Sequence, residues 1–98
     1  MQIQIHSIHF DADQKLLTFI DEKMKKLFSI YGDIISGEVF LKIEKSDSRD
    51  NKVTEIKLAV PGNDLFAGKQ SKSFEESTDL AIEALKRQIE KHKMKAVK

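Results

Sequence analysis

The chain has 98 residues, 40% of them hydrophobic and 34% charged, which suits one soluble domain with a layer of helices on a layer of sheet. No apolar run approaches the roughly 20 residues that span a bilayer, and the lack of cysteine excludes disulfides, thiolate metal sites and cysteine nucleophiles. The net charge of +1 excludes nothing by itself. We expect a single cytoplasmic domain over residues 1–98 with no membrane partner.

The charge is unevenly distributed along the chain. Residues 86–98 carry six basic side chains and one acidic one, a net charge of +5, whereas the other 85 residues carry 11 basic and 15 acidic side chains, a net charge of −4. This asymmetry is typical of a molecule with one side that faces a polyanion. A solubilising tail without a partner explains the same pattern, and charge alone does not separate the two.

The first two elements are predicted to be a strand and a helix. Isoleucines alternate with polar residues over 1–8, which is the period of a half-buried strand. Asp13 is a suitable N-cap for the following helix, and Gly32 is expected at the C′ position after it. The helix has one apolar stripe at spacings of three and four residues, formed by Leu16, Ile20, Met24, Leu27 and Tyr31.

Three strands are predicted next. Alternation over 38–45 and 53–60 indicates two strands, and the polar segment 46–52 is expected to be the hairpin loop between them. The Pro61-Gly62 dipeptide indicates a turn, because proline fixes φ and glycine tolerates a positive φ. A short fourth strand is expected over 65–69, and hairpins of this kind make these three strands antiparallel.

The last element is a second helix that opens with a capping box. Ser73 and Glu76 have the S-x-x-E spacing of that motif. The apolar stripe of this helix consists of Phe74, Thr78, Ala81, Leu85 and Ile89. The order β-α-β-β-β-α predicts an α+β fold, a four-stranded sheet with both helices packed on one face. The basic end, about residues 93–98, is expected to fray.

No pattern in the sequence indicates catalysis or a metal site. His6 and His9 are three residues apart, so on an extended strand they point to opposite faces and share a metal only across a turn. His92 lies among lysines, which repel a divalent cation. The sequence has no nucleophile motif, glycine-rich phosphate loop or paired carboxylates in apolar surroundings. We expect no enzymatic activity, no cofactor, no metal and no small-molecule substrate.

The positive signal comes from basic residues on both helices. At about 100° per residue, a stripe beside the apolar face of the second helix comprises Arg87, Lys91, Lys95 and Lys98. One edge of the apolar stripe of the first helix is lined in the same way by Lys15, Phe19, Lys23 and Lys26. Two packed helices then offer a shared basic rim, a surface of the kind that follows phosphates. The preference of cations for helix C-termini explains these residues equally well.

The aromatic residues do not indicate a stacking platform for single-stranded RNA. Most of them suit core positions, namely Phe10, Phe19, Phe28, Tyr31 and Phe74. Phe40 and Phe66 fall opposite the apolar set of their strands, on the open face of the sheet. A stacking platform needs more aromatics on the central strands, so we expect RNA to be read by shape and backbone.

Four segments, taken in order, are similar to those of one known family. They are 1–7 (MQIQIHS), 22–27 (EKMKKL), 41–45 (LKIEK) and 81–93 (AIEALKRQIEKHK), and the last resembles the family's closing Leu-x-Arg-Gln-Leu-x-Lys-x-Lys helix. On these segments the chain resembles the short ribosome hibernation-promoting factors, also called ribosome-associated inhibitors or sigma-54 modulation proteins. The family fold is β-α-β-β-β-α, the order already predicted from periodicity.

The resemblance implies a partner and a set of contacts. It implies binding to rRNA of the small ribosomal subunit, in the channel where tRNA and mRNA lie, so that translation is blocked and idle ribosomes are stabilised. Carried over by position, the implied RNA-binding residues are Lys23, Lys26, Arg87 and Lys91, with Lys86, Lys93 and Lys95 ranked below them. Away from the ribosome the protein is expected to be monomeric.

The chain departs from the family pattern in two places. The family opens its last helix with Asp-Met-Tyr, where this chain has residues 73–75 (SFE), so any contact made by that tyrosine is missing. Long members carry a separate dimerisation domain after a linker. The sequence ends at Lys98 without one, so we do not expect it to join two ribosomes by that route.

Two other interpretations remain open. A general double-stranded RNA-binding module shares the later helix and strand order, but it carries lysines at the start of its last helix, where this chain has Glu75, Glu76 and Asp79. A protein-interaction domain would use the basic end as a docking tail without RNA.

Overall fold

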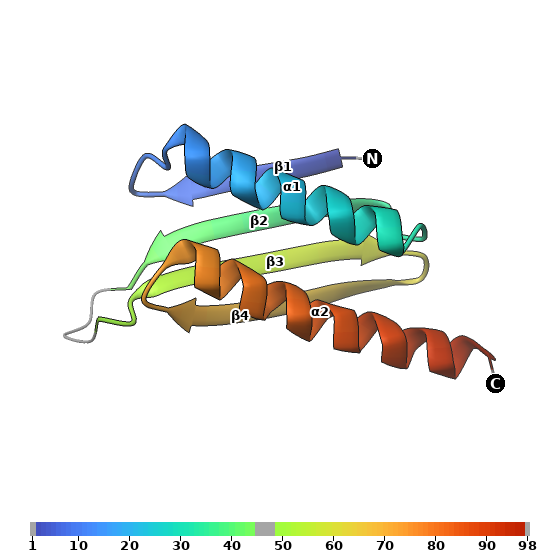
Figure 1. The fold of residues 1–98 in the computed structure, drawn as a ribbon. Coiled ribbons are helices and arrows are strands. Elements are labelled where there is room, and N and C mark those ends of the chain that lie inside the picture. The colour runs from blue at the N-terminus through green and yellow to red at the C-terminus, as the bar shows by residue number, and fades with distance from the viewer. Residues whose placement is uncertain (1, 45–48, 98) are drawn as a thin grey trace.

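The computed structural model describes residues 2–44 and 49–97, with side chains described as far as Lys91. The elements are β1 (Gln2–Ile8), α1 (Gln14–Ile30), β2 (Ser36–Ile43), β3 (Lys52–Val60), β4 (Asn63–Ser71) and α2 (Phe74–Val97). Both helices lie on the same face of one sheet, and the other face is open (Figure 1). This confirms the predicted α+β fold and its element order.

The sheet is mixed, with its strands in chain order β1-β2-β3-β4. β1 and β2 are parallel because α1 crosses over between them, whereas β2, β3 and β4 form the expected antiparallel hairpins. The strands that precede the two helices, β1 and β4, therefore run in the same direction. Both helices consequently start at the same end of the sheet and run side by side in parallel (Figure 1).

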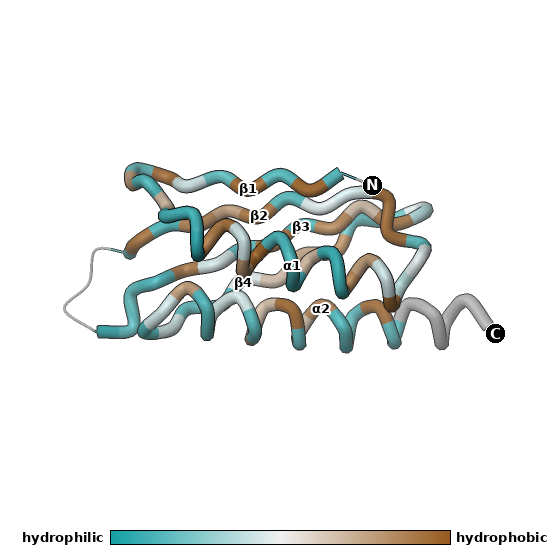
Figure 2. Tube along the Cα trace, turned by 45° about the horizontal axis from the view of Figure 1, so that its top comes forward, coloured by the Kyte–Doolittle hydropathy of each residue, from teal (hydrophilic) through white to brown (hydrophobic). Residues whose placement is uncertain are grey.

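The core consists of the two predicted helical stripes and the sheet face beneath them. All ten stripe residues are buried, and so are Val39, Leu41, Ile56 and Leu58 on the central strands. Apolar and polar residues alternate along both helices, as expected when each helix buries one face (Figure 2). Within the described residues, neither helix contains an apolar stretch that could cross a membrane.

The boundaries of the three later strands differ from the predictions. The expectation of a short fourth strand over 65–69 is wrong, because β4 pairs with the whole of β3, from Val60 opposite Asn63 to Lys52 opposite Ser71. β2 spans Ser36–Ile43 instead of 38–45, and β3 begins at Lys52 instead of residue 53. Of the expected hairpin loop over 46–52, residues 46–48 lie outside the described residues.

The helix ends follow the predicted caps in part. The Leu16 N–H donates to Asp13 Oδ1 at 2.8 Å, and the Glu76 N–H donates to Ser73 Oγ at 3.1 Å, so both N-caps are confirmed. The Glu76 carboxylate accepts a hydrogen bond from the Ser71 hydroxyl. Gly32 does follow the C-cap residue Tyr31, but its φ is not positive, so it does not form a left-handed cap.

The turn between β3 and β4 has the predicted form. Gly62 has a φ of +79° and directly follows Pro61, which is the sign pattern of a type II turn. Val60 and Asn63 pair on either side of the dipeptide, so two residues suffice to reverse the chain.

A buried group of hydroxyls joins α2 to the sheet. The Thr54 Oγ1 on β3 lies 2.6 Å from Ser77 Oγ and 3.2 Å from Thr78 Oγ1, and all three side chains are fully buried. The Ser77 hydroxyl also donates to the Phe74 carbonyl. Within the described residues no buried side-chain nitrogen or oxygen lacks a partner, so this polar group fixes α2 over β3 without an unpaired atom.

Gly37 on β2 leaves room for two large side chains of α1. A Cβ atom at this position would lie 2.7 Å from Met24 Cε, and 3.2 Å from both Phe28 Cζ and Leu58 Cδ2. The space left by the missing side chain is thus filled by side chains of α1 from above and of β3 from the side. The position of α1 over the sheet depends on this contact.

We predict that Gly37→Ala lowers the free energy of unfolding by about 1 kcal/mol, because the Met24 methyl group has to move and Phe28 and Leu58 leave it little room. Urea denaturation followed by circular dichroism measures this change. Gly32→Ala is the matched control, since a Cβ atom there would meet no other atom within 4 Å and the φ of Gly32 is not positive. Equal stability of the two variants would contradict the close packing at Gly37.

Candidate nucleic-acid interface

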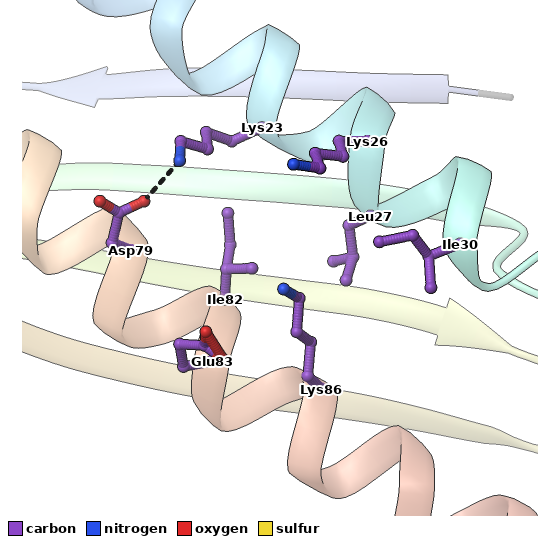
Figure 3. A pocket seen from close by; sticks show the side chains of 8 residues that line it. All are labelled: Lys23, Lys26, Leu27, Ile30, Asp79, Ile82, Glu83 and Lys86. Carbon is purple, nitrogen blue, oxygen red and sulfur yellow. Dashed lines mark ion pairs between the residues drawn. The ribbon is translucent and has the colours of Figure 1, made fainter.

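A groove runs between α1 and α2 on the side of the helices away from the sheet. Its volume is about 320 Å³. Its lining consists of Lys23, Lys26, Leu27 and Ile30 from α1 and of Asp79, Ile82, Glu83 and Lys86 from α2. Three lysine side chains from the two helices extend into the space between them (Figure 3). The groove therefore brings together charges that are some 60 residues apart in the sequence.

Lys23 is held in place from both sides. Its Nζ lies 3.2 Å from Asp79 Oδ1 on α2 and 5.4 Å from the centre of the Phe19 ring on α1. The lysine and aspartate side chains are 42% and 52% exposed, so the ion pair contributes less than about 1 kcal/mol to stability. Its consequence is positional, since it keeps one ammonium group at the mouth of the groove.

Lys26 and Lys86 face each other across the groove, and neither charge is compensated by a contact with an acidic side chain. Neither forms an ion pair or a hydrogen bond with any other described residue, and Figure 3 shows both ammonium groups directed into the groove. Because a cation with no fixed partner binds an added anion without first breaking a contact, these two lysines are the best placed to bind phosphate.

A hydrogen bond between Tyr31 and Glu90 joins the helices beyond the groove. The Tyr31 hydroxyl donates to Glu90 Oε1 at 2.8 Å, and the tyrosine is buried. This hydrogen bond, followed by burial, raises the pKa of Tyr31 above its usual value of 10.0. Together with the Lys23–Asp79 pair it sets the spacing of α1 and α2 on both sides of Lys26 and Lys86.

The structure separates the predicted RNA-binding residues into two groups. Lys23, Lys26 and Lys86 lie together in the groove. Arg87 and Lys91 are exposed on α2 but do not line it, because they stand about 100° and 140° around the helix axis from Lys86. They lie on the outer surface of α2. The side chains of Lys93 and Lys95 lie outside the described residues.

Sequence reasoning missed the groove residues that are not basic. Ile30 is 51% exposed, whereas Leu27, one turn earlier, is buried. An isoleucine just off the buried stripe of an amphipathic helix was the available signal. Asp79 and Glu83 carried no signal by themselves, because their position depends on how the two helices pack.

The open face of the sheet has a different character. His6 stacks on Phe40 with ring centres 5.0 Å apart, and its Nε2 lies 3.3 Å from Glu38 Oε2. On the same face Lys42 forms an ion pair with Glu55, so these two charges compensate each other. Among the described residues no group of three or more metal-ligating side chains comes together. Phe40 and Phe66 occupy the open face as predicted, but they do not form a platform.

The chain is similar to known proteins over nearly its whole length. The sequence profile described as "Sigma 54 modulation protein / S30EA ribosomal protein" matches residues 3–97. A protein of Pseudomonas putida named "Ribosome hibernation promoting factor" is 28% identical over 95 residues, which covers 97% of this chain and 89% of that protein. A protein of the same name from Azotobacter vinelandii is 28% identical over 97 residues, with coverage of 99% and 87%.

Two solved structures have the same fold. A ribosomal subunit interface protein from Coxiella burnetii superposes with a TM-score of 0.85 at 21% identity, over 96% of this chain and 99% of that one. The N-terminal domain of Protein Y from Thermus thermophilus gives a TM-score of 0.78 at 15% identity, over 94% and 99%. At these identities the likeness concerns the fold.

We predict that Glu90→Gln lowers the pKa of Tyr31, because the raised value depends first on the hydrogen bond to the Glu90 carboxylate. Tyr31 is the only tyrosine, so tyrosinate absorbance during an alkaline titration reports on it alone. Glu75→Gln, at the start of α2, is the control and should leave the titration unchanged.

The same hydrogen bond makes stability depend on pH. A folded-state pKa above the unfolded value gives stabilisation that is complete below about pH 10 and is lost as the pH rises through the folded pKa. We expect wild type to lose this contribution on alkaline titration and Tyr31→Phe to lack it. Parallel alkaline denaturation curves of the two proteins would contradict the contact.

Proposed function

Because the chain belongs to the Sigma 54 modulation protein / S30EA ribosomal protein family, we propose that it binds the small ribosomal subunit in the channel of tRNA and mRNA and keeps idle ribosomes inactive. The names of its relatives support this proposal, since they are ribosome hibernation promoting factors and a ribosomal subunit interface protein. The protein acts in the cytoplasm by occlusion and performs no reaction.

The observation that carries the proposal is the convergence of Lys23, Lys26 and Lys86 from two helices on one groove. Arg87 and Lys91 extend the positive charge from there onto the outer surface of α2. A surface of this kind binds the backbone of folded RNA, where phosphates of neighbouring strands come close together. Its binding energy comes mainly from released counterions, so it depends strongly on salt.

The structure also bears on the two competing interpretations. The start of α2 carries exposed Glu75 and Glu76 in its first turn, which would repel the phosphates that a double-stranded RNA-binding module contacts there. A domain that binds proteins through a basic tail does not need lysines in a groove between its helices. Both remain outcomes of the experiments below.

We predict that Arg87→Glu with Lys91→Glu abolishes co-sedimentation with small subunits at low salt, and that Lys26→Glu with Lys86→Glu does the same. Each pair replaces two attractive charges by two repulsive ones on the proposed interface. Because all four side chains are at least partly exposed, the thermal unfolding of both variants should resemble that of wild type.

The matched control is Lys42→Glu with Lys57→Glu, two charge reversals on the open face of the sheet. We expect this variant to co-sediment like wild type. Loss of binding in the control, or full binding by both helix variants, would place the RNA-binding surface elsewhere.

We predict a second effect, on the salt dependence of binding. Each lysine that neutralises a phosphate adds roughly 1 to the slope of log affinity against log salt concentration, so Lys26→Gln with Lys86→Gln should reduce the slope by about 2. Titrations at several salt concentrations measure it. An unchanged slope would show that these lysines do not contact phosphate.

A further inference from the structure

The groove between α1 and α2 contains more than a phosphate site requires. Its three lysines are accompanied by two carboxylates, Asp79 and Glu83, so its charge from these five groups is only +1. Carboxylates repel phosphate, and a surface that only follows an RNA backbone gains nothing from them. Asp79 has a partner in Lys23, whereas Glu83 has none among the described residues, so Glu83 suits a ligand with hydrogen-bond donors as well as negative charge.

The groove also exposes an apolar side chain. Ile30 is 51% exposed and is directed into the groove beside Leu27, with Ile82 on the opposite helix (Figure 3). Leu27 and Ile82 are buried, so they form the base of the groove and Ile30 forms its wall. This apolar surface has no partner within the described residues, and it lies within reach of the same ligand as the lysines.

From this combination we infer that the groove binds one unpaired nucleotide of the RNA, with its phosphate at Lys26 and Lys86 and its base against Ile30 and Ile82. The inference rests on the proposed function, because the RNA is the one that the two helices bind. A volume of about 320 Å³ is at the lower end for small-ligand sites, about 300–1,000 Å³. A duplex is too wide for such a groove, whereas a single unstacked nucleotide enters it.

The carboxylates supply the remaining recognition. Aspartate and glutamate accept hydrogen bonds from the amino groups of bases, as they do from cytosine N4. Asp79 is already paired with Lys23, which leaves Glu83 as the acceptor for a base edge. The groove thus contains one partner for each part of a nucleotide: cations for the phosphate, aliphatic side chains for the face of the base and a carboxylate for its edge.

Two substitutions distinguish a nucleotide site from a phosphate site. Ile30→Ser should weaken binding to small subunits about fivefold, because it removes the apolar surface against which the base would lie. Ile35→Ser is the matched control, because Ile35 is 58% exposed but does not line the groove. The affinity of this variant for small subunits should equal that of wild type.

Glu83→Ala changes affinity in opposite directions for the two kinds of site. If the groove takes a base, removal of the acceptor weakens binding severalfold. If the groove takes only phosphate, removal of a repulsive carboxylate strengthens it. Unchanged or tighter binding of Glu83→Ala therefore overturns the inference, as does wild-type affinity of Ile30→Ser.

Chemical probing of the rRNA bases identifies the occupant. With wild-type protein, one unpaired base should lose reactivity on its Watson–Crick edge, and with Ile30→Ser it should regain that reactivity. Weaker binding of Ile30→Ser without any change in base reactivity would indicate a protein side chain in the groove and overturn the inference. If wild type itself does not bind small subunits, the proposed function fails, and the inference fails with it. The binding of wild type is measured first, so this outcome is known before any variant is compared.

Discussion

The close packing of α1 on β2 at Gly37 determines where the functional surface lies. Met24 and Phe28 of α1 occupy the space that a side chain at residue 37 would fill, so these two side chains set the distance between α1 and β2. On the neighbouring strand β3, the buried Thr54 hydroxyl contacts the hydroxyls of Ser77 and Thr78 on α2 and so fixes α2 in the same layer. With both helices at fixed positions on one rigid sheet, the groove between them has a defined width and a defined set of facing residues.

The strand directions determine which residues face each other in that groove. Since β1 and β4 run in the same direction, the helices that follow them are parallel, and the second half of α1 lies beside the middle of α2 (Figure 1). Lys26 then lies opposite Lys86, so two like charges face each other without a compensating contact. Such an arrangement costs some stability in the free protein, and under the proposed function an RNA backbone would remove that cost on binding.

Much of the fold follows from the sequence by local rules. The stripe from Leu16 to Tyr31, the N-caps at Asp13 and Ser73 and the turn at Gly62 all depend on residues close together in the chain. The length of β4 was underestimated because Asn63, Asp64 and Gly68 have low strand propensity, and only pairing along the whole of β3 makes them extended.

The site was less predictable than the fold. The sequence indicates which helices are basic, and the family resemblance ranks Arg87 and Lys91 above Lys86. Only the packing of the helices shows that Lys86 lines the groove. Ile30 and Glu83 acquire significance only beside the lysines of the other helix. Contacts between elements far apart in the chain decide the chemistry of the groove, and periodicity within one helix does not contain them.

The central claim is that the helical face, and not the open sheet face, lies against the small-subunit rRNA. The chain has no cysteine, so Ser29→Cys on α1 and Gln4→Cys on the open face of β1 each give a single attachment point for a hydroxyl-radical probe. We predict that the probe at residue 29 cleaves small-subunit rRNA at a few adjacent sites in the tRNA channel, and that the probe at residue 4 cleaves there weakly or not at all. Strong cleavage from residue 4 with none from residue 29 would contradict the account.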